Sequence, residues 1–144
     1  MIKIIIAFFF FLILVTFLIW LQMAKFQEKS ITKWISENFD EDYNVTYSLN
    51  TLGYPNRLDT NIKDMKLISK MSPNFIHLEE IKFVSIIYNQ NKHLLSLKLP
   101  IKFKVDENFF TINEGKIKAS FTKTENLDLN KFTFHGEKLN FKIN

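Results

Sequence analysis

The chain opens with an unbroken apolar run from Ile4 to Leu21, in which Thr16 is the only polar residue. As a helix rising about 1.5 Å per residue, this run would cover about 27 Å, close to the bilayer's hydrocarbon core of about 30 Å. Lipid offers the backbone no hydrogen-bond partner, so a spanning segment of this kind must be helical. Trp20 stands at the far end, where interfacial aromatic residues lie. The pattern predicts a transmembrane segment within residues 1–24.

We interpret this segment as an uncleaved signal-anchor. A secretory signal peptide has a shorter apolar core and a small-x-small cleavage site, which Gln22-Met23-Ala24-Lys25 does not provide. A buried core helix would need a larger domain around it. Lys and Arg are nearly matched on the two flanks, so the short tail before a folded domain favours an N-inside orientation. In a bacterium this places the chain in the inner membrane, single-pass, with its domain in the periplasm.

The next segment, residues 25–42, has the period of an amphipathic helix. Its apolar stripe is Ile31, Trp34, Ile35 and Phe39. We expect this helix to pack on the following domain, and the alternative is a helix lying on the membrane surface. The acidic triplet Asp40-Glu41-Asp42 is expected to end it as a solvated turn.

Apolar and polar residues then alternate with a period of two, which is typical of strands with one buried face. The signal Gly53-Tyr54-Pro55-Asn56 predicts a turn between two paired strands, with Gly53, Tyr54 and Pro55 as structural turn residues. Residues 69–74 are expected to form a loop, and residues 81–87 a strand covered on both faces. Further turns are predicted at residues 106–108 and 113–115.

The clearest strand runs from His93 to Val105, where Pro100 requires either a sheet edge or a bulge. No helix period follows Phe39, so the predicted fold class is α+β: a transmembrane helix and an amphipathic helix, then a curved antiparallel meander over residues 43–144. The apolar face of this sheet must be covered by the helix, by the sheet curling on itself, or by something outside the chain.

Three stretches also resemble a known family. They are Trp34, the segment 52–59 (Leu-Gly-Tyr-Pro-Asn-Arg-Leu-Asp), and the segment 87–93 with Leu99-Pro100 downstream. Together they are similar to an uncharacterised, mainly alphaproteobacterial family, domain of unknown function 2125, whose members carry a G-F/Y-P-x-R turn and a Y-N-P-N-H-like segment. Gln90 departs from the usual Pro, and Lys92 is an insertion before His93. The resemblance implies a signal-anchored envelope protein and, since members are longer, a chain holding only the first half. It assigns no chemistry.

The composition argues against an enzyme. The chain has no Cys, three scattered His, and no recognisable nucleophile, phosphate-binding, dinucleotide or zinc-protease motif. His77 near Glu79 and Glu80 is a weak metal candidate, and on a strand these two carboxylates would point to opposite faces. Arg57 and Asp59 are expected to form a local ion pair. We therefore predict no catalytic residue, no metal and no cofactor.

Two surfaces of the expected sheet are candidates for binding. The apolar ligand face comprises Leu95, Leu97, Leu99, Ile101, Phe103, Phe121 and Phe134. The opposite face could contact anionic lipid headgroups, or could simply be solvated, through Lys98, Lys102, Lys104, Lys116 and Lys118. The net charge of +4 suits anionic lipid, whereas aromatic residues do not interleave with these lysines as nucleic-acid stacking requires.

We predict a non-enzymatic, membrane-anchored envelope protein whose curved sheet offers its apolar face to lipid or another hydrophobic ligand. The alternative is an anchored assembly subunit that binds a protein partner through its last, open edge strand, residues 139–143. A ligand face should stay uncovered by the protein's own side chains, whereas a partner site should leave the last strand unpaired.

Overall fold

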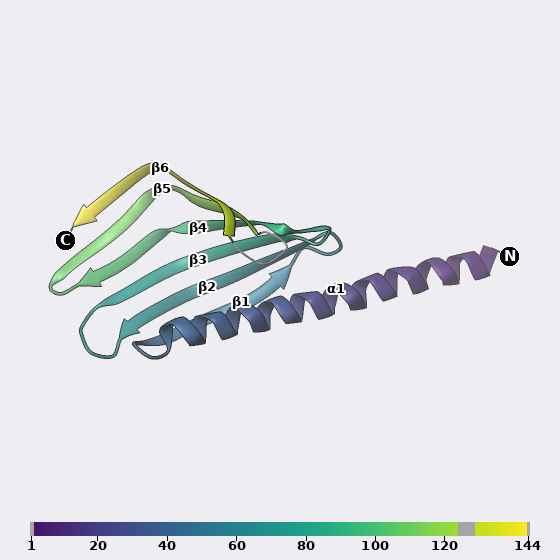
Figure 1. Ribbon diagram of the computed structural model, residues 1–144, viewed down its shortest axis with the longest axis horizontal. Helices are drawn as coiled ribbons and strands as arrows, with labels where there is room; N and C mark the ends of the chain where they lie inside the picture. The colour runs from purple at the N-terminus through teal and green to yellow at the C-terminus, as the bar shows by residue number, and fades with distance from the viewer. Residues whose placement is uncertain (1, 124–128, 144) are drawn as a thin grey trace.

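The computed structural model describes residues 2–123 and 129–143. It consists of one long helix followed by a six-stranded antiparallel sheet (Figure 1). The elements are α1 (Ile2–Phe39), β1 (Tyr43–Leu52), β2 (Arg57–Ser69), β3 (Phe75–Ile86), β4 (Asn89–Val105), β5 (Asn108–Lys123) and β6 (Leu129–Ile143). Each strand pairs with the next, in the order β1 to β6. The predicted fold class, α+β with an N-terminal helix and a meander sheet, is confirmed.

The apolar run and the amphipathic segment form a single helix of 38 residues. No Gly or Pro occurs before Gly53, so nothing in this stretch interrupts the backbone hydrogen bonding. The N-terminal part of α1 extends beyond the sheet, and only its C-terminal part lies along it (Figure 1). The apolar run therefore continues as helix into the segment that lies on the sheet, with no loop between the two.

The C-terminal end of α1 is fastened to the β2–β3 connection. Asp40–Asp42 form a turn, as the acidic triplet predicts. The ammonium group of Lys70 donates hydrogen bonds to the backbone carbonyls of Asp40 and Glu41. These carbonyl groups follow directly on Phe39, the last residue of α1, and a cation is favoured at this end of a helix by the helix dipole.

Ile35 forms the main contact between helix and sheet. It is 2% exposed and packs with Ile62, Met65 and Leu67 of β2. Ile31 and Phe39 join this cluster, but Trp34 does not: its side chain is 57% exposed and makes an edge-to-face contact with Phe39. Including Trp34 in the buried stripe was therefore wrong, because at 100° per residue it falls beside the contact line that Ile31 and Ile35 define.

Pro100 lies in β4, which has neighbours on both sides, so the bulge alternative is confirmed and the edge alternative is wrong. The register between β4 and β5 shifts between Leu97 and Ile101, and this irregularity accommodates a residue without an amide hydrogen.

The prediction of a turn at residues 113–115 was also wrong. β5 continues through them, with register shifts on either side of Glu114 and Gly115 at φ +121°. A bulge and a tight turn both favour Asn and Gly, because both need unusual backbone angles.

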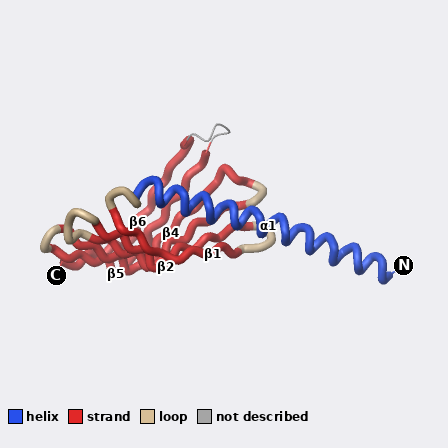
Figure 2. Tube along the Cα trace, turned by 90° about the horizontal axis from the view of Figure 1, so that it is seen from below, coloured by secondary structure: helices blue, strands red, loops and turns tan. Residues whose placement is uncertain are grey.

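The sheet is bent, and the helix lies on its concave side. Figure 2 shows α1 against the β1–β2 part of the sheet, and the sheet curves so that β5 and β6 extend toward the same side as the helix.

The sheet also has two distinct ends. The β1–β2 and β3–β4 turns form what we call the Tyr54 end, toward the N-terminus of α1. The α1–β1, β2–β3 and β4–β5 connections form the opposite, Glu107 end.

Candidate functional site

The concave face of the sheet is mainly apolar across its six strands. The strand register places its residues in rows that run from β1 to β6. One row is Leu49, Ile62, Ile81, Leu97, Ile117 and Gly136; the next, toward the Tyr54 end, is Thr51, Thr60, Phe83, Leu95, Ala119 and Phe134. Side chains on one face of a sheet alternate along each strand, so these rows form one continuous surface.

The helix covers only part of this surface. Among the elements described, the backbone of α1 comes close to β1 and β2 and to no other strand. Leu78 and Ile81 of β3 pack at the border of the cluster that contains Ile35. No helix of residues 2–123 and 129–143 therefore lies over the concave face of β4 to β6. Phe134 is 59% exposed and Ile76 is 38% exposed. The result is a curved apolar surface beside the helix that includes these exposed side chains, whereas Ile101, Ile112 and Ile117 within it are at most 9% exposed.

The uncovered part is ordered by contacts within the sheet. Ile101, Ile112 and Ile117 form a buried cluster flanked by Leu97, Leu99 and Phe103. The rings of Phe103 and Phe110 stack with centroids 5.0 Å apart. His93 stacks between Phe83 and Phe121, at 5.2 and 4.8 Å, and its Nδ1 lies 2.9 Å from Oγ of Ser85. Rings and branched side chains thus line the surface without closing over it.

The register brings together all seven residues predicted for the apolar ligand face. Leu95, Leu97, Ile101, Phe103 and Phe121 belong to consecutive rows, with Leu99 beside the bulge and Phe134 at the exposed end of its row. Sequence reasoning missed Phe83, Phe110 and Ile112 as members of the same face, although their alternation was visible; the strand pairing was needed to place them opposite β4.

A polar seam divides the covered part of the concave face from the Tyr54 end. The hydroxyl of Thr60, which is 0% exposed, lies 2.8 Å from the hydroxyl of Thr51 and accepts a hydrogen bond from Nε2 of Gln27 at 2.7 Å. Buried hydroxyl groups are costly unless paired, so this network fixes the position of α1 over β1 and β2.

The β1–β2 turn packs against the apolar run of α1. The hydroxyl of Tyr54 lies 2.9 Å from Oγ1 of Thr16, and its ring makes edge-to-face contacts with Phe17 and Trp20. Nε1 of Trp20 donates a hydrogen bond of 2.8 Å to the backbone carbonyl of Arg57. Gly53 has φ +106°, and a Cβ there would lie 2.9 Å from the carbonyl oxygen of Arg57. Gly53, Tyr54 and Pro55 thus lie in the β1–β2 turn, and this turn contacts the helix.

The convex face carries the predicted lysines at three separate places. Lys98, Lys116 and Lys118 line a shallow hollow of about 430 Å³, whereas Lys102 borders another of about 370 Å³ nearer the Glu107 end. Lys104 lies further along, paired in register with Phe75 and Phe109. The five lysines share a face but do not converge on one site.

Lys98 is partly neutralised by two carboxylates. Its Nζ lies 3.9 Å from Glu79 and 4.0 Å from Glu80. Opposite faces for these two glutamates were therefore a wrong prediction, since a register shift between Leu78 and Glu80 breaks the alternation and brings both carboxylates to one cation.

The predicted ion pair of Arg57 and Asp59 is confirmed, at 3.0 Å, and Lys82 approaches the same carboxylate oxygen at 3.2 Å. His77 faces Asp64 at 3.8 Å rather than Glu79 or Glu80. Among the residues described, no three His, Cys, Asp or Glu side chains come close enough together to hold a metal ion.

The last strand pairs with β5 along its length, for example Ile112 with Phe141 and Phe110 with Ile143. Its outer side is an edge of the sheet as described. Lys138, at φ +51°, and Lys142 lie on this edge strand, and positive charge and irregular backbone are features that discourage pairing with another strand.

No protein-family model, no curated protein and no solved structure matches this chain. The family resemblance of the segments around Gly53 and Tyr88 therefore stays a prediction.

Proposed function

We propose that this protein is a single-pass membrane protein that holds an acyl chain of a lipid, or another elongated hydrophobic ligand, on the concave face of β4 to β6. The observation that carries the proposal is that the apolar surface is wider than the helix that lies on it. The apolar rows cross all six strands, whereas α1 lies over β1 and β2. A concave, contiguous apolar surface that no other element covers is typical of a binding site.

Membrane anchoring is supported by the exposure of the apolar run. The helix is long and apolar enough to cross a membrane, and only 6% of its most apolar 18-residue window is buried against the rest of the protein. A core helix of a soluble domain would be mostly buried. Exposed side chains of this kind, including Phe8, Phe9 and Phe10, at 61–67%, need an apolar surrounding.

Retention of the helix, rather than cleavage as a signal peptide, is supported by its packing. Trp20 and Ala24 form a buried cluster with Leu58 of β2, so cleavage near residue 24 would remove part of the protein's own core. We therefore favour a signal-anchor, with the short N-terminal tail in the bacterial cytoplasm and the sheet in the periplasm.

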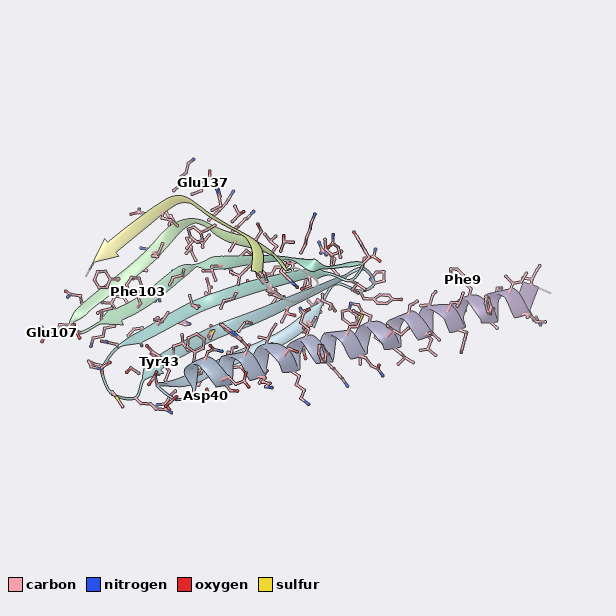
Figure 3. All side chains as sticks on the ribbon, viewed as in Figure 1. Phe9, Asp40, Tyr43, Phe103, Glu107 and Glu137 are labelled. Carbon is pink, nitrogen blue, oxygen red and sulfur yellow. The ribbon has the colours of Figure 1, made fainter. Side chains whose placement is uncertain are left out.

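The proposed orientation is testable because the chain has no native Cys. Glu107 is exposed at the end of the sheet farthest from Phe9 (Figure 3). A Glu107→Cys variant expressed in bacteria should react with a membrane-impermeant maleimide when only the outer membrane is permeabilised. Labelling that requires lysis of the inner membrane would place the sheet in the cytoplasm and contradict this part of the proposal.

The ligand proposal is tested by native mass spectrometry of the full chain, extracted in mild detergent from bacterial membranes. Two neighbouring leucines give a matched pair: Leu95 lies on the concave face opposite Phe83 and Ala119, whereas Leu94, 41% exposed, lies on the convex face. Wild type and Leu94→Asp should carry phospholipid mass that Leu95→Asp loses, because a charge in the apolar row opposes acyl-chain burial.

Circular dichroism identifies variants that remain folded, and lipid surrounding α1 is common to all of them. Equal lipid occupancy of folded Leu95→Asp and Leu94→Asp, or lipid-free wild type, would refute the ligand proposal. In the lipid-free case the open edge of β6 becomes the better candidate, as the site of a protein partner. We rank this alternative second because Lys138 and Lys142 stand on that edge.

A further inference from the structure

The Tyr54 end of the sheet is fixed at a defined position along the apolar run. The Tyr54 hydroxyl contacts the hydroxyl of Thr16 and lies 3.5 Å from the carbonyl oxygen of Ile13. Thr16 is five residues before Leu21, where the run ends. At about 1.5 Å per residue, this contact lies about 7 Å inside the end of the run. If the run fills the hydrocarbon core, Tyr54 therefore reaches below the border of the core.

The backbone of this turn is suited to such a depth. Arg57 N–H donates to the carbonyl of Gly53 at 3.0 Å, and Ile87 N–H donates to the carbonyl of Asn56 at 3.2 Å. The Arg57 carbonyl accepts from Trp20. Polar backbone groups inside or bordering the hydrocarbon must be paired within the protein, and these three carbonyls are.

The β1–β2 and β3–β4 turns at the Tyr54 end differ in polarity from the connections at the Glu107 end. The turn residues of the Tyr54 end, residues 53–56 and 87–88, carry no charged side chain. Tyr88 is 82% exposed and Leu52 is 53% exposed beside these turns. The connections at the Glu107 end carry the acidic triplet Asp40–Asp42, Lys70, and the pair Asp106-Glu107, with Met71 as their one apolar residue. Figure 3 shows Asp40 and Glu107 at that end, far from Phe9.

Tyr88 suits a position at the membrane–water interface, where tyrosine is enriched because its ring lies in apolar surroundings and its hydroxyl is hydrated. Lys92, exposed at the start of β4, adds a positive charge near the level of lipid phosphates. Tyr88, exposed on an uncharged turn, and Leu52, exposed beside another, lie at the end of the sheet that is tied to the membrane-spanning run, and both suit contact with the bilayer.

We propose that the β1–β2 and β3–β4 turns insert into the interface of the leaflet that α1 leaves, so that the concave face of the sheet opens directly onto the lipid acyl chains. This inference rests on the membrane anchor of the proposed function and not on ligand binding. The occupant of the Tyr54 end is thus the bilayer itself, and a lipid would reach the sheet without crossing water.

The test uses single-cysteine variants of the full chain, Leu52→Cys, Tyr88→Cys and, as the matched control, Glu107→Cys, each carrying a nitroxide label. Tyr88 and Glu107 stand at turns on opposite ends of β4, a strand of 17 residues that spans about 50 Å. All three side chains are exposed, so labelling removes little packing. The proteins are reconstituted in vesicles of phosphatidylcholine and phosphatidylglycerol, and vesicle flotation establishes anchoring.

Electron paramagnetic resonance then compares collisions of each label with oxygen, which partitions into lipid, and with a water-soluble nickel chelate. We expect oxygen to exceed the chelate several-fold at Leu52 and Tyr88, and the reverse at Glu107. A protein that floats with the vesicles, yet shows the Glu107 profile at Leu52 or Tyr88, would overturn the inference and leave the anchor intact. A protein that does not float would overturn both.

Discussion

The hydroxyl oxygens of Tyr54 and Thr16 lie 2.9 Å apart, although 38 residues separate them in the sequence. Thr16 is the only polar residue of the apolar run, and it also donates to the carbonyl of Ile13 at 2.9 Å. This contact gives the one polar side chain of the run a second partner and, together with the hydrogen bonds of Trp20 and Gln27, holds the sheet at its position along the helix. It links the membrane-spanning part of the protein to the part that carries the concave apolar face.

Removing the Tyr54 hydroxyl should loosen this link. We expect Tyr54→Phe to lower the stability of the sheet by about 0.5–1.5 kcal/mol, the usual net value of one hydrogen bond, because the ring contacts with Phe17 and Trp20 remain. Thermal unfolding followed by circular dichroism in detergent micelles measures it. Tyr88→Phe is the control, since that side chain is 82% exposed, and its melting temperature should equal that of wild type. Equal melting temperatures for both variants would contradict the proposed role of the contact.

The hydroxyl of Thr60 should matter more, because it is fully buried between two partners. Thr60→Val keeps the shape but leaves the Thr51 hydroxyl and the Gln27 amide without their partner. We expect a loss of about 1–3 kcal/mol in the free energy of unfolding. Thr46→Val, at an exposed position of β1, should change it little. If urea titrations show the two variants equally stable, the polar seam does not hold α1 on the sheet.

Gly115 should not tolerate a side chain. Its φ is +121°, and an added Cβ would lie 2.6 Å from the carbonyl oxygen of Glu137. We expect Gly115→Ala to destabilise the β5–β6 pair by about 1–3 kcal/mol. Gly136→Ala meets only flexible side-chain atoms, the nearest at 3.3 Å, and should stay within about 1 kcal/mol of wild type. The protection of β6 amides against hydrogen exchange measures the effect of both variants. Unchanged protection in Gly115→Ala would contradict a continuous β5.

The Asp59 carboxylate should stabilise the sheet through two cations. It is 5% exposed and accepts from Arg57 at 3.0 Å, with Lys82 at 3.2 Å. Asp59→Asn keeps the shape and removes the charge that these cations share, and we expect a loss of about 1–3 kcal/mol. Asp64→Asn is the control, because its side chain is 74% exposed and Asn tolerates the positive φ found there. Chemical denaturation that ranks the control as the more damaging variant would refute this assignment.

The sequence predicted the elements well where periodicity is strong. Six alternate apolar positions identified β4, and an uninterrupted apolar run identified the first half of α1, because a period of two or a long unbroken run excludes other structures. The prediction from sequence failed where one extra residue in a strand shifts the alternation of side chains between the two faces of the sheet. The bulges at Glu79 and Gly115 shift the register by a single position, and a local pattern does not distinguish such a shift from a turn.

For the candidate site, the sequence predicted which residues share a face but not whether that face is covered. Alternation placed Leu95 to Phe103 on one face, but whether that face is covered depends on where α1 lies. This position is set by contacts between distant residues, such as Gln27 with Thr60 and Thr16 with Tyr54. Neither pair leaves a local signal: Gly53-Tyr54-Pro55 indicated a turn, and nothing in that segment indicated its partner on the helix.

The central claim, that the uncovered concave face holds lipid, is tested most directly by photo-crosslinking in bacterial membranes whose phospholipids carry radioactive phosphate. A photoreactive benzoylphenylalanine replaces Leu95 on the concave face or Leu94 on the convex face, two neighbours that differ in the face they occupy. The account predicts that light attaches labelled phospholipid to the protein at position 95 and not at position 94. No labelling at position 95, or equal labelling at both positions, would contradict it.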